Sequence, residues 1–107
     1  MEADPNVISE LVDRIVQTVQ PVKIILFGSA VRGDFVQNSD LDVMVVMPDG
    51  IHRNRTADRI HRGLWGLGFA KDIIVQTESD LREHADNPYL VIRNALKEGK
   101  ELYHAAR

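Results

Sequence analysis

Two short polar motifs, each next to an apolar run, carry the groups in this sequence that could do chemistry. Gly28 and Ser29 follow one apolar run, and Asp40 and Asp42 lie two residues apart where the next run begins. Because side chains alternate between the faces of a strand, carboxylates at this spacing point to the same side and can share a hard cation such as Mg²⁺. A sharp turn into a helix presents unpaired backbone N–H groups, which favour phosphate. The motifs therefore predict a phosphate site beside a magnesium site.

Each motif taken alone has a simpler interpretation. A Gly-Ser pair after a strand is usually an ordinary turn, and an Asp-x-Asp pair at the start of a strand is usually a solvated edge. The combination is more specific, because Arg32 and Gly33 follow the first motif and Ser39 directly precedes the second. Arg32 could reach a phosphate or form a structural ion pair with a nearby acid.

Together these residues resemble the signature of the minimal nucleotidyltransferases (MNT), small stand-alone members of the DNA polymerase β-like nucleotidyltransferase superfamily. The resemblance spans nearly the whole chain, since an N-terminal helix, a strand with an acid at Asp72 and the closing stretch 91–103 all look like that family. Val31 stands where the family commonly has Ala, a difference expected to affect packing rather than chemistry.

The resemblance implies a site for nucleotidyl transfer with two Mg²⁺ ions and ATP as substrate. The resemblance assigns catalysis and metal binding to three carboxylates, Asp40, Asp42 and Asp72. Asp40 and Asp42 would bind both ions, and Asp72 would bind the second ion and help to deprotonate the acceptor. Nucleotide binding is assigned to Gly28, Ser29 and Arg32. All three acids are present, which favours a catalytic protein over a degenerate copy.

The acceptor is expected to come from a partner, because 107 residues leave no room for a separate acceptor domain. MNT proteins that resemble this one are commonly encoded beside HEPN-family ribonuclease toxins and transfer AMP from ATP to a toxin tyrosine. The resemblance thus implies a magnesium-dependent antitoxin enzyme, a protein adenylyltransferase. Two alternatives stay open: an antitoxin that neutralises the toxin by binding alone, and an aminoglycoside-type nucleotidyltransferase that modifies a small molecule.

The remaining pattern predicts the elements that position these motifs. Strands are expected at 22–27, 41–47 and 71–77, and helices at about 5–20, 29–34, 53–64, 79–84 and 88–98. An acid such as Asp72 at the start of a buried strand is costly unless it is paired or metal-bound. The expected fold is α/β and is formed by residues 1–107 as a single domain, with a small mixed β-sheet and helices packed mainly on one face. The resemblance implies that this fold is a polymerase β-like palm.

Two features of the middle of the chain have no role in this scheme. The basic segment, residues 53–62, has four arginines and forms either a solvated helix face or a surface for an acidic or phosphate-rich partner. Its helix is expected to lie beside the mouth of the site. Trp65 is expected to pack in the core.

Composition excludes several classes of protein. The net charge of −3 and the isoelectric point near 5.7 give no general attraction to nucleic acid or to anionic membranes, so no stable nucleic-acid binding is expected. The sequence has no cysteine and no apolar run near the roughly 20 residues that span a bilayer. The acidic first residues lack the features of a secretory signal, and a cytoplasmic protein is therefore expected.

Overall fold

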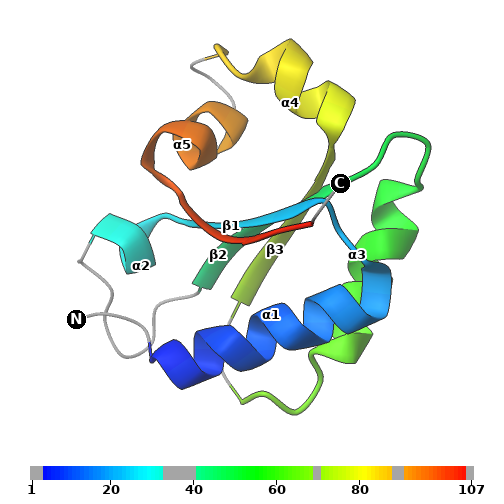
Figure 1. The fold of residues 1–107 in the computed structure, drawn as a ribbon, viewed down its shortest axis with the longest axis vertical. Coiled ribbons are helices and arrows are strands. Elements are labelled where there is room, and N and C mark those ends of the chain that lie inside the picture. Colours follow the sequence, from blue (N-terminus) through cyan, green and yellow to red (C-terminus); the bar gives the residue numbers. More distant parts are fainter. Residues whose placement is uncertain (1–3, 33–40, 69–70, 88–90, 106–107) are drawn as a thin grey trace.

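The computed structural model describes residues 4–32, 41–68, 71–87 and 91–105. Its elements, labelled in Figure 1, are α1 (Pro5–Val19), β1 (Lys23–Phe27), α2 (Ser29–Arg32), β2 (Leu41–Met47), α3 (Arg53–Gly63), β3 (Lys71–Thr77), α4 (Glu78–His84), α5 (Val91–Glu98) and β4 (Lys100–His104). The strands predicted at 41–47 and 71–77 have the predicted bounds. Parts of the predicted second and last helices lie outside the described residues.

The strands form one mixed sheet in the order β3-β2-β1-β4. Strand β1 runs antiparallel to both of its neighbours, β2 and β4, while β2 and β3 are parallel. The sequence patterns did not predict β4, because its residues are mostly half-buried or exposed and give no clear apolar alternation. Strand β1 is an interior strand, as expected, and four of its five residues are buried.

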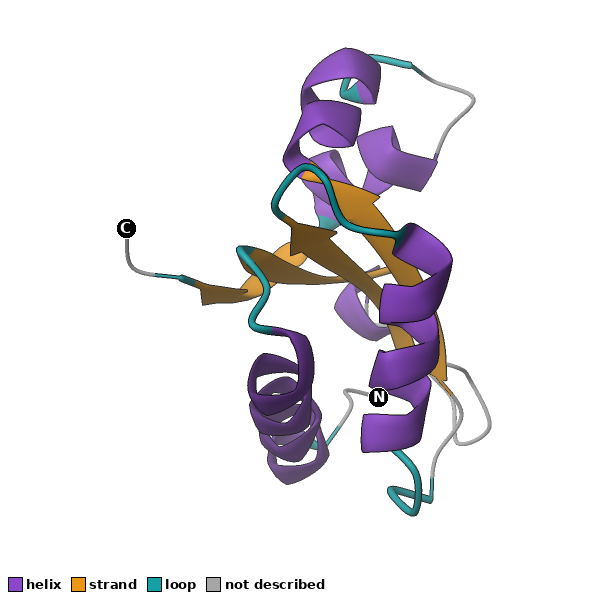
Figure 2. Cartoon of the chain, turned by 90° about the vertical axis from the view of Figure 1, so that its right-hand side faces the viewer, coloured by secondary structure: helices purple, strands orange, loops and turns teal. Residues whose placement is uncertain are grey.

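Helices cover both faces of this sheet, as Figure 2 shows. The longest helices, α1 and α3, pack on one face, where Leu11, Ile15 and Ile60 meet inward-facing residues of β2 such as Val43. The shorter α4 and α5 pack on the other face, where the core consists of Ile25, Phe27, Met44, Val46, Ile92 and Ala95. The expectation of helices mainly on one face thus describes α1 and α3 but leaves out α4 and α5.

Helix α1 forms because its ends are capped and its apolar residues share one side. The Asp4 side chain accepts a hydrogen bond from the Asn6 N–H at 2.9 Å, and Pro5 occupies the first turn. Leu11 and Ile15 are fully buried, which is worth about 1.5–3 kcal/mol for each side chain. At the other end Gln20 adopts a left-handed conformation with φ of 53° and ends the helix.

The end of the sheet where β2 and β3 finish is closed by polar contacts. Thr77 and Asp80 form a reciprocal capping box at the start of α4. Asp49, after β2, accepts hydrogen bonds from the Ser79 hydroxyl at 2.6 Å and the Ser79 N–H at 2.9 Å. Bonding by Ser79 lowers the pKa of Asp49, and the Thr77 N–H lowers the pKa of Asp80.

None of the helices in the described part of the chain is long and apolar enough to cross a membrane.

Candidate active site

Two of the predicted carboxylates lie next to each other on neighbouring strands. Asp42 of β2 pairs in register with Asp72 of β3, and because these strands are parallel the two side chains leave the sheet on the same face. This is the face of Met44 and Ile74, which α5 and α4 cover. The position of each acid follows from the sequence of its own strand, whereas the pairing of the two strands brings the acids together.

The end of β1 approaches this pair through a glycine. Phe27 is the register partner of Asp42, so Gly28 follows directly beside the carboxylate. Gly28 has φ of +77°, and a Cβ at this position would overlap the Asp42 carboxylate. Glycine is therefore required twice here, for its backbone conformation and for the close approach.

A cavity of about 250 Å³ joins these residues. Its lining consists of Phe27, Gly28, Asp42, Asp72, Ile74, Asn94 and Glu98. The predicted site residues did not include Asn94 and Glu98, although these are four residues apart and so share one face of α5. That spacing was the available signal, but only the packing of α5 over the sheet reveals what the face meets.

The other predicted site residues are placed less completely. Ser29 is half-buried and begins α2 directly after Gly28, but it is not among the residues that line the cavity. The backbone of Arg32 ends α2, and its side chain lies outside the described part of the structure. Asp40 also lies outside the described residues.

The carboxylates fit a hard cation in their chemistry, since Mg²⁺ prefers carboxylate oxygens and uses few protein ligands. Asp42 and Asp72 provide such oxygens from neighbouring strands on one face. Within the described residues, no group of three His, Cys, Asp or Glu side chains could hold a metal ion by itself. The third predicted ligand, Asp40, is not among those residues.

The environment of Asp72 differs from the expectation. Asp72 is exposed. The expected cost of burying an unpaired acid therefore does not apply to Asp72. Asp72 is the second residue of β3, and the buried residues of this strand begin at Ile73. Its register with Asp42 is the stronger argument.

The basic segment does not lie at the mouth of this cavity, contrary to expectation. Helix α3 packs with α1 on the opposite face of the sheet. Arg59 donates to the Thr18 carbonyl of α1 at 2.7 Å, and Arg53 forms an ion pair with Asp80 of α4 at 3.2 Å. These two arginines therefore connect elements from exposed positions, and Arg55 and Arg62 are exposed as well.

Trp65 is also placed differently from the prediction, because its side chain is 85% exposed. The preceding Leu64 is fully buried and takes the core position at the end of α3. The Trp65 carbonyl accepts a hydrogen bond from Arg14 at 3.0 Å, which ties this turn to α1.

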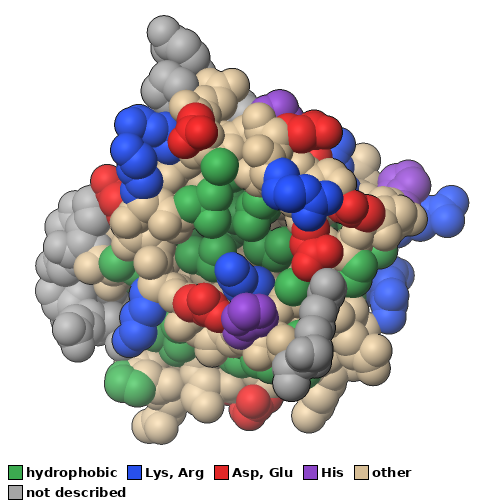
Figure 3. All heavy atoms as spheres, turned by 45° about the horizontal axis from the view of Figure 1, so that its top comes forward, with side chains coloured by type: hydrophobic (Ala, Val, Ile, Leu, Met, Phe, Trp, Pro, Cys, Tyr) green, Lys and Arg blue, Asp and Glu red, His purple; other side chains and the backbone are tan. Residues whose placement is uncertain are grey.

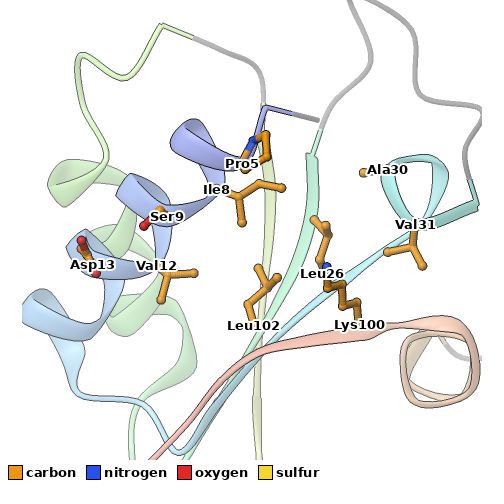
Figure 4. Close-up of a pocket in the computed structure, with 10 residues that line it drawn as sticks. All are labelled: Pro5, Ile8, Ser9, Val12, Asp13, Leu26, Ala30, Val31, Lys100 and Leu102. Carbon is orange, nitrogen blue, oxygen red and sulfur yellow. The ribbon is translucent and has the colours of Figure 1, made fainter. Parts of the chain in front are cut away.

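A larger cavity of about 370 Å³ lies between α1, α2 and β4. Figure 4 shows Ile8 and Val12 of α1 facing Leu26 and Leu102 of the sheet across it. Leu26 and Leu102 belong to the core on the α1 face, so this cavity is on the other side of the sheet from Asp42. Val31 also lines it, which agrees with a packing role for that residue.

Comparison with known proteins identifies the family. Residues 8–102 match the nucleotidyltransferase domain family. The chain is 33% identical over 81 residues to a candidate protein adenylyltransferase of Methanocaldococcus jannaschii, and the match covers 76% of this chain and 77% of that protein.

Solved structures share the fold. A toxin–antitoxin structure with AMP-PNP matches with a TM-score of 0.68 and 19% identity, over 92% of this chain and 73% of the other. A candidate nucleotidyltransferase of Sulfolobus solfataricus gives 0.64 and 20%, over 92% and 78%. A mutant of the toxin–antitoxin MntA-HpeT gives 0.62 and 17%, over 96% and 75%. With the family match, these folds confirm the predicted architecture: the chain belongs to the nucleotidyltransferase domain family and is a nucleotidyltransferase.

Proposed function

We propose that this chain is a magnesium-dependent protein adenylyltransferase that acts as an antitoxin, transferring AMP from ATP to a tyrosine of a HEPN-family ribonuclease toxin. The observation that carries the proposal is the meeting of Asp42, Asp72 and Gly28 in one cavity of a nucleotidyltransferase domain. An acid pair beside a glycine turn is what nucleotidyl transfer needs, because charge on the triphosphate must be neutralised next to its binding loop.

In this proposal the three aspartates, Asp40, Asp42 and Asp72, hold two Mg²⁺ ions, which supply charge neutralisation at the triphosphate. The Ser29 hydroxyl and the backbone at Gly28 bind its phosphates, and Arg32 adds a cation beside them. The acceptor oxygen forms a bond to the α-phosphorus while the bond from that phosphorus to the bridging oxygen breaks. Pyrophosphate leaves with the electron pair, and Asp72 helps to remove the acceptor proton.

A protein acceptor is supported by the relatives. The Methanocaldococcus jannaschii relative is a candidate protein adenylyltransferase, and two of the similar structures are toxin–antitoxin structures. The face that bears α4 and α5 shows hydrophobic side chains at its centre, surrounded by acidic and basic ones (Figure 3). An apolar centre with a charged rim is typical of a surface that a protein partner covers.

The test is transfer of label from α-labelled ATP to a purified HEPN-family ribonuclease toxin. We expect label on a partner tyrosine, located by mass spectrometry, that is lost with EDTA and with Asp42→Asn. Neutralisation of the toxin without ATP and without label would replace the proposal with an antitoxin that acts by binding alone. Label on an aminoglycoside instead of the protein would replace it with a small-molecule transferase.

A further inference from the structure

The turn after α3 presents a tryptophan to solvent. Trp65 is 85% exposed, although the residue before it, Leu64, is fully buried. The backbone of the turn is held by two hydrogen bonds. The Trp65 N–H donates to the Arg62 carbonyl at 3.3 Å, and the Trp65 carbonyl accepts from the Arg14 guanidinium at 3.0 Å. Because a large apolar ring in water is unfavourable and Trp is enriched where proteins bind each other, this position indicates an interface.

Trp65 continues a line of exposed residues along α3, here called the outer stripe. Its members, at intervals of three, four and three residues, are Arg55, Asp58, Arg62 and Trp65. This spacing keeps them on one face of a helix, opposite the buried Thr56 and Ile60. Within the described part of the chain, none of the three charged side chains of the outer stripe forms an ion pair. These charges are therefore available to a partner.

The order of residues in the outer stripe is complementary to itself. Asp58 and Arg62 each lie two residues from Ile60, and Arg55 and Trp65 each lie five residues from it. If two copies of α3 pack antiparallel about a two-fold axis at Ile60, residues at equal distances from Ile60 lie opposite each other. Asp58 of each copy then meets Arg62 of the other. Trp65 of each copy meets Arg55 of the other, which is the arrangement of a cation–π contact. The axis repeats both contacts, as an interface between identical chains requires.

Other occupants fit the outer stripe less well because of its acid. A nucleic acid would place phosphates against the Asp58 carboxylate, which lies between the two arginines, and like charges weaken binding. An acidic protein surface would meet the same repulsion. A second copy instead provides a guanidinium for Asp58 and a carboxylate for Arg62.

We infer that the outer stripe is a dimerisation surface whose occupant is a second copy of this chain. Helix α3 covers the same face of the sheet as α1, whereas Asp42 lines a cavity on the other face. The dimer interface is therefore separate from the candidate active site, and the dimer does not depend on the proposed function. Because the contact is small and mostly polar, we expect a weak dimer with a Kd on the order of 100 µM.

The test exchanges the two charges and measures association by sedimentation velocity over a concentration series. Asp58→Arg and Arg62→Asp each place like charges opposite each other, so each should weaken the dimer at least about tenfold. The double variant restores opposite charges in exchanged positions and should dimerise within about threefold of wild type. The matched control is Arg82→Asp, which reverses an exposed arginine of α4 outside the outer stripe and should change nothing.

Trp65 gives a second readout, because it is the single tryptophan of the sequence. Its emission should shift to shorter wavelength as the wild-type concentration rises, and should not shift in Asp58→Arg. A wild type that stays monomeric up to about ten times the expected Kd overturns the inference. So does a dimer that the single substitutions leave unchanged or that the double variant fails to restore. A shift of the emission on adding a short single-stranded RNA to a monomeric wild type would assign the outer stripe to nucleic acid instead.

Discussion

The two faces of the sheet use alternate residues of the same strands for different purposes. Along β2, Leu41, Val43 and Val45 point to α1 and α3 and are almost completely buried. The intervening Met44 and Val46 pack under α5, but Asp42 opens into the cavity. One face is therefore apolar along its whole length, and the other changes from apolar to acidic toward one end.

The difference follows from which helices cover each face. Helix α1 has 15 residues and α3 has 11, whereas α4 has 7 and α5 has 8. The long helices bury the face that stabilises the domain, and the short ones leave the acidic end of the other face accessible. Core substitutions on the α1 face should accordingly change stability alone, whereas core substitutions on the α5 face should change both stability and transfer.

The largest effect is expected from the paired acids. Asp42→Asn and Asp72→Asn should each lower transfer by more than the roughly 10- to 100-fold that loss of an outer-shell partner costs a metal site. Without metal, both variants should unfold at the wild-type temperature or slightly above it, because a repulsion is relieved. Transfer rates and thermal unfolding with and without Mg²⁺ check this, with Asp13→Asn on α1 as the control. Near wild-type turnover by either folded variant would show that the substituted acid has no role in transfer.

Two glycines with nearly the same φ allow the effect of backbone strain to be separated from the effect of the close approach of Gly28 to Asp42. Gly28 and Gly68 have φ of +77° and +78°, but only at Gly28 would an added Cβ meet a neighbour, the Asp42 carboxylate. Gly28→Ala and Gly68→Ala should both lose about 1–2 kcal/mol of unfolding free energy through the left-handed conformation. Only Gly28→Ala should also lose transfer. Equal activity of the two variants would mean that Gly28 matters for the turn alone.

Truncation of core residues compares the two faces directly. Ile15→Ala on the α1 face should cost about 2–5 kcal/mol of unfolding free energy and leave the Kd for ATP unchanged. Ile92→Ala should cost a similar amount and also raise the KM for the protein acceptor, because Ile92 anchors the helix that carries Asn94 and Glu98. Denaturant unfolding and acceptor kinetics measure the two effects. If the acceptor KM rises equally in both variants, the two faces of the sheet do not differ in their effect on the acceptor.

A smaller effect is expected at the phosphate loop. Ser29→Ala should weaken ATP binding by about 1.5–3 kcal/mol if the hydroxyl bonds to a phosphate oxygen. Isothermal titration with AMP-PNP and Mg²⁺ gives the Kd, and Ser9→Ala on the exposed side of α1 serves as the matched control. Unchanged affinity for AMP-PNP would show that Gly28 and Ser29 form a turn and that the Ser29 hydroxyl does not bind phosphate.

The smallest effect concerns the polar contacts at the far end of the sheet. Thr77→Ala should cost about 1 kcal/mol by removing the cap of α4, without any change in transfer. The pKa of Asp80 is lowered, first by the Thr77 N–H, so its stabilising effect is present above the usual aspartate pKa and is lost as the pH falls through the lowered one. Below about pH 4 the wild type should therefore lose stability more steeply than Asp80→Asn, measured by thermal unfolding across pH. Parallel curves would show that the contact contributes nothing.

Much of the fold follows from local sequence. The apolar run 41–47 sets the bounds of β2, and the alternation of a strand places Asp42 on the face opposite to Leu41 and Val43. Caps such as Asp4 fix where helices begin. These features depend on the backbone period and on neighbouring residues, which is why the sequence alone was sufficient to predict them.

The tertiary structure alone decided what these elements meet. Three features join segments that are distant in sequence: the register of Asp42 with Asp72, the addition of β4 at the sheet edge, and the place of Glu98 in the cavity lining. The exposure of Trp65 also depends on how the elements pack. No local period encodes such pairings, since they depend on how the apolar faces of separate elements pack together. In the sequence Glu98 resembles any other surface acid near the end of a helix, and only the packing of α5 on β1 shows that it lines the same cavity as Asp42.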